Sequence, residues 1–148
     1  MDYKSSETII KNILALGHDR AMQDVVEFLH MNFKHYSWVA IYIVKGSELV
    51  LGPWQGKQAT EHTNIPIGTG VCGSAVQSGR TEIVDDATKD DRYLSCFIST
   101  KSEIVVPIKR WKKVIGEIDI DSDTCNAFNH QDKVFLEKIA EMLSHHIR

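Results

Sequence analysis

The chain has 148 residues, of which 43% are hydrophobic and 25% charged, and its formal net charge is −3. This length and composition are typical of one ordinary globular domain with its own core, and the interspersed charges exclude the basic stripe of a nucleic-acid binder. The N-terminal segment lacks the features of a signal peptide, and no apolar run approaches the ~18 residues needed to span a bilayer, so we expect a cytoplasmic protein without membrane contact.

The two ends of the chain are predicted to be helical. Apolar residues recur at helical spacing over 5–16 and again over 19–34, with Gly17 between the two segments. The same spacing over 129–147 predicts a closing helix.

Strand formers dominate the next part of the chain. Residues 38–44 read as a strand, and a turn then leads into a second strand over 48–51, which predicts a hairpin. The pair Gly52 and Pro53 is predicted to end this hairpin and to open an exposed polar loop that continues to residue 64.

The second half alternates short elements with loops. Residues 65–79 read as a short strand, a glycine turn and a helix, and residues 81–84 as another short strand. Residues 85–101 are polar, acidic and without period, which predicts a long irregular loop of the kind that often carries function. Two further strands are expected over 103–108 and 114–120.

Together these elements predict the mixed α/β class, of the α+β type. We expect one domain over 1–148, built from N-terminal helices (5–34), a sheet that carries the site (37–121) and a C-terminal helix (129–147). An antiparallel sheet with helices packed on it accounts for this order of elements.

Three cysteines, an odd number, do not form a disulfide framework. Cys96 lies in the irregular loop, where a thiol is accessible, although an aromatic-flanked packing role is an alternative. Cys72 falls at the expected first turn of a helix, where the helix dipole would stabilise a thiolate, unless the site is only a tight strand-to-helix turn. Cys125, in a turn before the last helix, is interpreted as incidental.

Asp119 and Asp121 are the most unusual pair in the sequence. On a strand they point to the same side, roughly 7 Å apart, opposite Ile118 and Ile120. Their repulsion should raise at least one pKa unless a cation lies between them. They suit an ammonium site, a protonated acid that donates a proton, a hard metal with few ligands, or simply a half-exposed strand face.

Glu103 begins the preceding strand and would share a face and an end with this aspartate pair if the two strands form a hairpin. The seven histidines have no spacing of a zinc finger, so no metal centre is expected.

Beyond these local features, the sequence resembles the GAF-domain family of free methionine-(R)-sulfoxide reductases. The resemblance extends from about residue 37 to residue 147. The motifs that carry it are 38–42, 49–57, 65–73, Cys96 with 101–107, and 115–122.

The resemblance implies a GAF fold, with a central antiparallel sheet of about six strands and the terminal helices on one face. It also implies that Cys96 is the catalytic thiol, that Glu103, Asp119 and Asp121 hold the substrate, and that Trp38 and Tyr42 form the aromatic wall of the pocket. Glu103 and Asp121 are the candidates for the proton donor. Backbone amides near Gly70 and Val71 are candidates for binding the substrate carboxylate at a helix start.

Two positions depart from the family pattern. Many members have a further cysteine about ten residues before the one that Cys72 matches, whereas residues 58–64 contain none and His62 lies near that position. Phe97 also follows Cys96 where the family often has Asp. Cys72 is therefore the expected resolving cysteine, although Cys125 or direct attack by the external thiol is an alternative.

The implied activity is reduction of free methionine sulfoxide without an organic cofactor, recycled by an external dithiol such as thioredoxin. Members of this fold often pair through their terminal helices, so the same resemblance leaves a homodimer open, and the sequence does not give the oligomeric state. The competing interpretations are a non-catalytic GAF sensor of a small ligand and a thiol redox sensor, either acting in trans.

Overall fold

The fold was obtained as a computed structural model, which describes residues 2–91 and 99–147. The helices are α1 (Tyr3–Ala15), α2 (Ala21–Asn32), α3 (Gly70–Ser78) and α4 (His130–Leu143), with a short 3₁₀ turn η1 (Ala87–Lys89). The strands are β1 (Trp38–Lys45), β2 (Glu48–Gln55), β3 (Asn64–Pro66), β4 (Glu82–Val84), β5 (Ser102–Arg110) and β6 (Lys113–Ser122).

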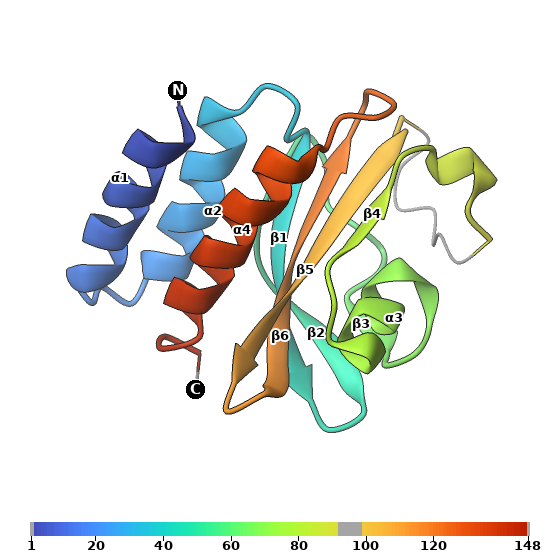
Figure 1. Cartoon of the computed structure of the whole chain (residues 1–148). Helices are drawn as coiled ribbons and strands as arrows, with labels where there is room; N and C mark the ends of the chain where they lie inside the picture. Colours follow the sequence, from blue (N-terminus) through green and yellow to red (C-terminus); the bar gives the residue numbers. More distant parts are fainter. Residues whose placement is uncertain (1, 92–98, 148) are drawn as a thin grey trace.

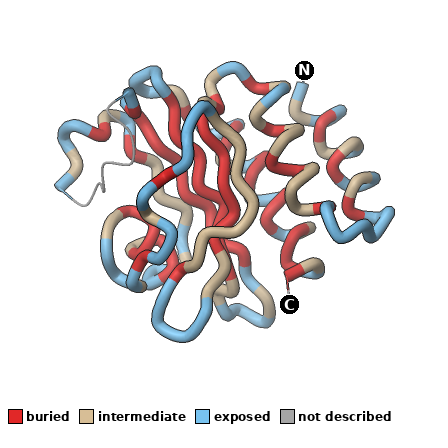
Figure 2. Tube along the Cα trace, turned by 180° about the vertical axis from the view of Figure 1, so that it is seen from behind, coloured by how far each residue is buried: buried red, intermediate tan, exposed pale blue. Residues whose placement is uncertain are grey.

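Within the described residues, the six strands form one antiparallel sheet in the order β3-β2-β1-β6-β5-β4. Figure 1 shows that α1, α2 and α4 lie on one side of this sheet, with both chain termini, while α3 lies on the other. Seen from behind in Figure 2, the central strands are buried along most of their length. This arrangement confirms the predicted GAF-type sheet with the terminal helices on one face.

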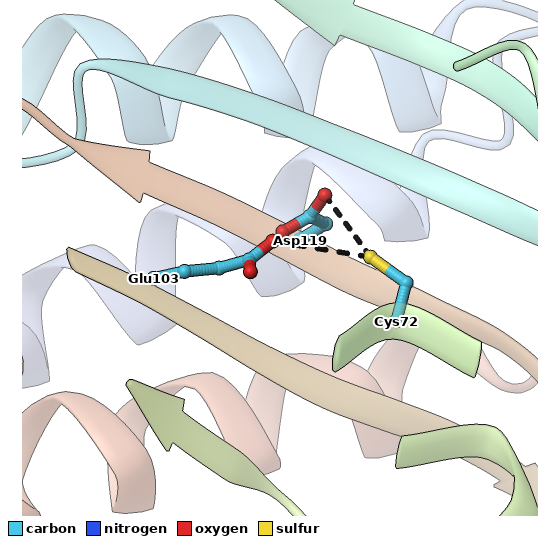
Figure 3. Close-up of side chains that lie close together, drawn as sticks. All are labelled: Cys72, Glu103 and Asp119. Atoms are coloured by element: carbon cyan, nitrogen blue, oxygen red, sulfur yellow. Dashed lines mark hydrogen bonds between the residues drawn. The ribbon is translucent and has the colours of Figure 1, made fainter. Parts of the chain in front are cut away.

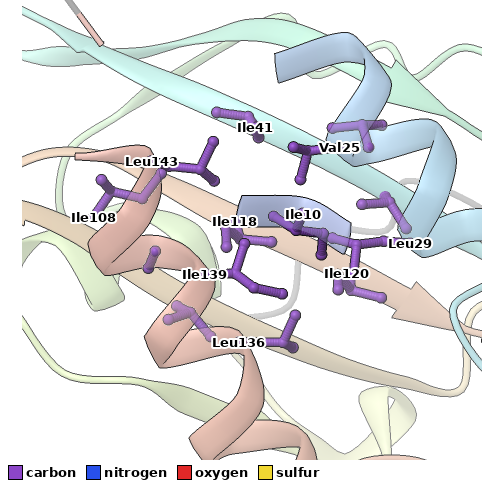
Figure 4. Packing of buried hydrophobic residues seen from close by; sticks show 14 of the residues in the cluster. Ile10, Val25, Leu29, Ile41, Ile108, Ile118, Ile120, Leu136, Ile139 and Leu143 are labelled. Atoms are coloured by element: carbon purple, nitrogen blue, oxygen red, sulfur yellow. The ribbon is translucent and has the colours of Figure 1, made fainter. Parts of the chain in front are cut away.

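The face of the sheet under the terminal helices holds the main core. Ile118 and Ile120 of β6 pack there with Ile41 of β1 against residues of α2 and α4, and all three side chains are at most 1% exposed (Figure 4). Burial of isoleucine and leucine side chains at this density stabilises the sheet by roughly 2 kcal/mol per residue. The opposite face carries a second, smaller hydrophobic cluster, which includes Ala40 and Tyr42 of β1 and Val71 and Ala75 of α3.

Strand β2 is longer than the sequence indicates. Gly52 and Pro53 do not end it; it continues to Gln55 because Ala40 pairs with Trp54 whereas Tyr42 pairs with Leu51, which leaves two residues of β2 opposite one residue of β1. Such a bulge accepts a proline, whose missing N–H is not required there. The expected loop over 52–64 is correspondingly shorter.

Helix α4 begins with a reciprocal cap. The Asn129 side chain accepts hydrogen bonds from the amides of Gln131 and Asp132, and the Asp132 carboxylate accepts one from the Asn129 amide. The helix ends at Leu143, four residues before the predicted end, where Arg110 donates to the carbonyls of Ser144 and Ile147. None of the described helices is long and apolar enough to cross a membrane.

Candidate active site

The site begins with the two-residue period of β6. Since Ile118 and Ile120 face the helices, Glu117, Asp119 and Asp121 all point to the opposite face, where each side chain is at most 1% exposed. The predicted aspartate pair is thus present, but it lies inside the protein rather than on a half-exposed strand.

The neighbouring strands place a partner beside each of these carboxyl groups. Trp38 of β1 and Glu103 of β5 flank Asp121 on either side. Asp119 lies between Ala40 and Val105, and Glu117 between Tyr42 and Pro107. We call Glu103, Glu117, Asp119 and Asp121 the carboxylate cluster.

Cys72 reaches this cluster from the other layer. It lies in the first turn of α3, and its Sγ is 3.3 Å from Oδ2 of Asp119 and 3.9 Å from Oε2 of Glu103. Figure 3 shows the three side chains converging from α3, β5 and β6. Helix α3 can approach because residue 73 is glycine: a Cβ there would lie 2.7 Å from the carbonyl oxygen of Pro66.

Burial is the main reason that the carboxylate cluster is protonated more readily than free carboxylic acids. It raises the pKa of Glu117 and of Asp121 well above their ordinary values, and the charge of Asp119 adds to both. Burial also raises the pKa of Asp119, against the hydrogen bonds that it makes with Glu103 and Cys72. Each of these buried carboxyl groups therefore keeps its proton to a higher pH than a free carboxylic acid does.

The Cys72 thiol does not have the activated character that a helix start suggested. Burial raises its pKa well above 9.0, and the charges of Asp119, Glu117 and Glu103 raise it further. Burial and the three nearby carboxyl groups outweigh the partial charge of a nine-residue helix. Cys72 is therefore a neutral thiol that has a proton acceptor beside it.

Glu117 is the residue of this cluster that the sequence reasoning missed. It is fully buried, and within the described part of the chain neither of its carboxyl oxygens meets the distance and angle of a hydrogen bond. The sequence pattern does indicate this residue, because the two-residue alternation that singles out Asp119 and Asp121 extends back to Glu117.

A pocket of about 210 Å³ opens next to Asp121. Its lining residues are Ser37, Trp38, Lys57, Gln58, Ser99, Thr100, Asp121 and Asp123. Thr100 donates to Oδ2 of Asp121 at 3.3 Å, and Gly56 packs so closely on Trp38 that a Cβ would lie 2.2 Å from its ring. The aromatic ring of Trp38 and the carboxyl group of Asp121 thus line the same small pocket.

Tyr42 lies deeper, and its hydroxyl donates to the backbone carbonyl of His62 at 2.8 Å. This bond holds the backbone at His62 to strand β1, and the charge of His62 favours the ionised form of Asp119. His62, which stands near the position of the family's additional cysteine, is therefore close to the cluster.

The remaining candidate residues from the sequence lie in different parts of the structure. Cys96, the expected catalytic thiol, lies within 92–98, outside the described residues. Gly70 begins α3 with φ +68°, and Val71 is buried directly after it. Cys125 is exposed. As for metals, one set of donors among the described residues could hold an ion: Cys72, Glu103 and Asp119, whose ligand atoms lie within 4.8 Å of one another.

The model of the GAF domain matches residues 18–147. A free methionine-R-sulfoxide reductase of Saccharomyces cerevisiae is 44% identical over 112 residues, a match that covers 73% of this chain and 61% of the yeast protein. The enzyme of the same name from Escherichia coli is 34% identical over 115 residues, covering 78% of this chain and 68% of that protein.

Solved structures of the same family are also similar to this chain. The crystal structure of free methionine-R-sulfoxide reductase from Neisseria meningitidis, in complex with its substrate, superposes with a TM-score of 0.90 at 32% identity. The superposition covers 98% of this chain and 87% of that chain.

Proposed function

Because this chain belongs to the GAF-domain family of free methionine-R-sulfoxide reductases, we propose that it reduces free L-methionine (R)-S-oxide to L-methionine. The observation that carries the proposal is the buried cluster of carboxyl groups beside a thiol, next to a small pocket with an aromatic wall. We propose further that the reaction takes place in the cytoplasm, where the thiol pool is reducing.

The carboxylate cluster suits the ammonium group of a free amino acid. Asp119 and Asp121 are buried, and the structure gives each a carboxyl oxygen that no described hydrogen-bond donor reaches. An ammonium group supplies three donors and one positive charge, which would satisfy these oxygens through charge-assisted hydrogen bonds. A methionine sulfoxide within a peptide chain has no free ammonium group, so this site would select the free amino acid.

Aromatic residues would hold the rest of the substrate. Trp38 lines the pocket and Tyr42 lies behind it, so their rings can pack on the methylene and methyl groups. The amides of Gly70 and Val71 at the start of α3 would donate hydrogen bonds to the substrate carboxylate, which the helix dipole favours.

In the first chemical step, the thiolate of Cys96 attacks the sulfoxide sulfur. The sulfur–oxygen bond of the sulfoxide breaks, the oxygen passes to Cys96 and takes a proton, and methionine leaves. The proton would come from the carboxylate cluster, with Glu103 or Asp121 as the acid. Methionine sulfoxide is reduced and Cys96 is oxidised to the sulfenic acid.

In the second step, Cys72 condenses with the sulfenic acid of Cys96 to form a disulfide and one molecule of water. The carboxyl group of Asp119, 3.3 Å from Sγ of Cys72, would accept the thiol proton as the new bond forms. A thioredoxin-like dithiol would then reduce the disulfide. The cycle requires this external reductant and no organic cofactor.

A turnover assay with free methionine-(R)-sulfoxide and dithiothreitol tests the proposal. Methionine should accumulate with the wild type and be absent with Cys96→Ser, whereas Cys125→Ser should behave as the wild type. Asp119→Asn should raise KM for the substrate more than it lowers kcat. Saturable binding of methionine sulfoxide without turnover would contradict the proposed activity and would indicate a ligand-sensing GAF domain instead.

A further inference from the structure

We propose that the reduced site also binds a zinc ion, with Cys72, Glu103 and Asp119 as its ligands. The three donors come from α3, β5 and β6, and their side chains converge in Figure 3. The ion would occupy the space in which the proposed substrate places its ammonium group.

The spacing of the donor atoms fits a small four-coordinate ion. With a zinc–sulfur distance of about 2.3 Å and zinc–oxygen distances of about 2.0–2.2 Å, tetrahedral geometry separates sulfur from oxygen by about 3.5 Å. Sγ of Cys72 lies 3.3 Å from Oδ2 of Asp119 and 3.9 Å from Oε2 of Glu103, on either side of this value. Shifts of a few tenths of an ångström would bring both sulfur–oxygen separations to the tetrahedral value, and all three ligand atoms already lie within 4.8 Å of one another.

A second observation points independently to a cation. Oδ1 of Asp119 and Oδ1 of Asp121 are buried, and no hydrogen-bond donor among the described residues reaches them. Buried carboxyl groups are normally paired with cations or coordinate metals, because leaving them unpaired is destabilising by several kcal/mol. A divalent ion would supply the missing positive charge at the centre of the cluster.

The donor set indicates which metal. A thiolate combined with carboxylates suits zinc, whereas magnesium and calcium prefer sites built from oxygen alone. Binding converts the Cys72 thiol to a metal-bound thiolate, so each ion bound at this site releases the thiol proton to solvent. The same bond would keep Cys72 from acting as the resolving thiol.

One consequence rests on the proposed function. Zinc and the substrate ammonium would require the same carboxyl groups, so zinc should inhibit reduction of methionine sulfoxide in competition with the substrate. Binding of the metal itself does not depend on that activity.

Cobalt(II) provides a direct test, because a cobalt–thiolate bond gives a charge-transfer absorption that carboxylate and histidine ligands do not give. The reduced, metal-free protein should develop this absorption with one equivalent of Co²⁺, and Zn²⁺ should abolish it. Cys72→Ser should eliminate the absorption, and Asp119→Asn should weaken binding at least about tenfold. Cys125→Ser and the double variant His145→Ala/His146→Ala control for the exposed thiol and for surface histidines.

The outcomes are separable. No thiolate absorption in the wild type, or an unchanged absorption in Cys72→Ser, overturns the zinc site even if methionine sulfoxide is turned over. An absorption that depends on Cys96 rather than Cys72 also overturns it. Metal binding that depends on Cys72 but is insensitive to methionine sulfoxide leaves the zinc site in place and contradicts the proposed substrate position.

Discussion

The thiol of Cys72 and the carboxyl group of Asp119 face each other across 3.3 Å, between helix α3 and strand β6. Asp119 is a hydrogen-bond acceptor for the thiol, and its charge helps to raise the pKa of Cys72. The Cys72 thiol is therefore protonated and unreactive, and the Asp119 carboxyl group beside it can accept its proton. Such an arrangement suits a thiol that reacts second, with a neighbouring sulfenic acid.

We expect Cys72→Ser to separate the two steps of the proposed cycle. The variant should release about one equivalent of methionine per protein and then stop when thioredoxin is the reductant, because no resolving thiol remains. Rapid quenching and quantification of methionine measure this burst. Cys125→Ser should turn over normally, and sustained turnover by Cys72→Ser with thioredoxin would contradict the resolving role.

Glu117 should lower the stability of the folded protein at neutral pH. Because burial raises its pKa above 4.5, the folded state holds its proton more tightly than the unfolded state. Stability is therefore lost as the pH rises above 4.5 toward the raised value. Glu117→Gln should be more stable than the wild type by about 1 kcal/mol or more at pH 7 and equal to it below pH 4.

Urea unfolding at several pH values measures this difference. The exposed Glu61 provides the matched substitution, Glu61→Gln, which should leave the stability unchanged. A Glu117→Gln curve that runs parallel to the wild-type curve at all pH values would show that Glu117 is ionised in the folded state.

Asp132 joins three parts of the fold on the helical side. Its Oδ1 accepts hydrogen bonds from the hydroxyls of Tyr36 at 2.7 Å and Tyr3 at 2.9 Å and from Nε2 of His35 at 2.8 Å. Burial alone would raise the pKa of Asp132, but the hydrogen bonds from His35, the Asn129 amide and the two tyrosines lower it below 3.8. Burial and Asp132 raise the pKa of Tyr3 to about 12.

Replacement of Asp132 should therefore be destabilising, most of all above pH 4. A carboxylate whose pKa is lowered by folding adds stability above its ordinary pKa of 3.8, and this stability is lost as the pH falls through the lowered value. We expect Asp132→Asn to be less stable by about 2–4 kcal/mol at pH 7 and to lose less stability than the wild type on acidification. Chemical denaturation at pH 7 and pH 3 checks both parts, and an equal loss at the two pH values would contradict the ionised state.

Gly56 should govern the position of the pocket wall. An alanine Cβ at this residue would lie 2.2 Å from Cδ1 of Trp38, so the indole ring must move. We expect Gly56→Ala to raise KM for methionine sulfoxide several-fold and to lower stability by about 1–3 kcal/mol. Gly17→Ala, strained by its φ of +65° but far from the pocket, should lower stability and leave KM unchanged.

Local patterns were sufficient for much of the fold. The helical spacing of apolar residues identified α1, α2 and α4, and the two-residue period of β6 placed Asp119 and Asp121 together on the face opposite Ile118 and Ile120. These inferences succeed because side-chain direction follows directly from helix or strand geometry. The extension of β2 past Pro53 was not predictable, because a bulge depends on the partner strand.

The sequence by itself thus determined which carboxyl groups share a face, and its motifs determined the family. Only the tertiary structure decided that these groups are buried and that Cys72 is a neutral thiol beside Asp119. The physical reason is that burial and charge coupling depend on what the opposite layer, here α3, brings within a few ångströms. No spacing along the chain encodes that distance.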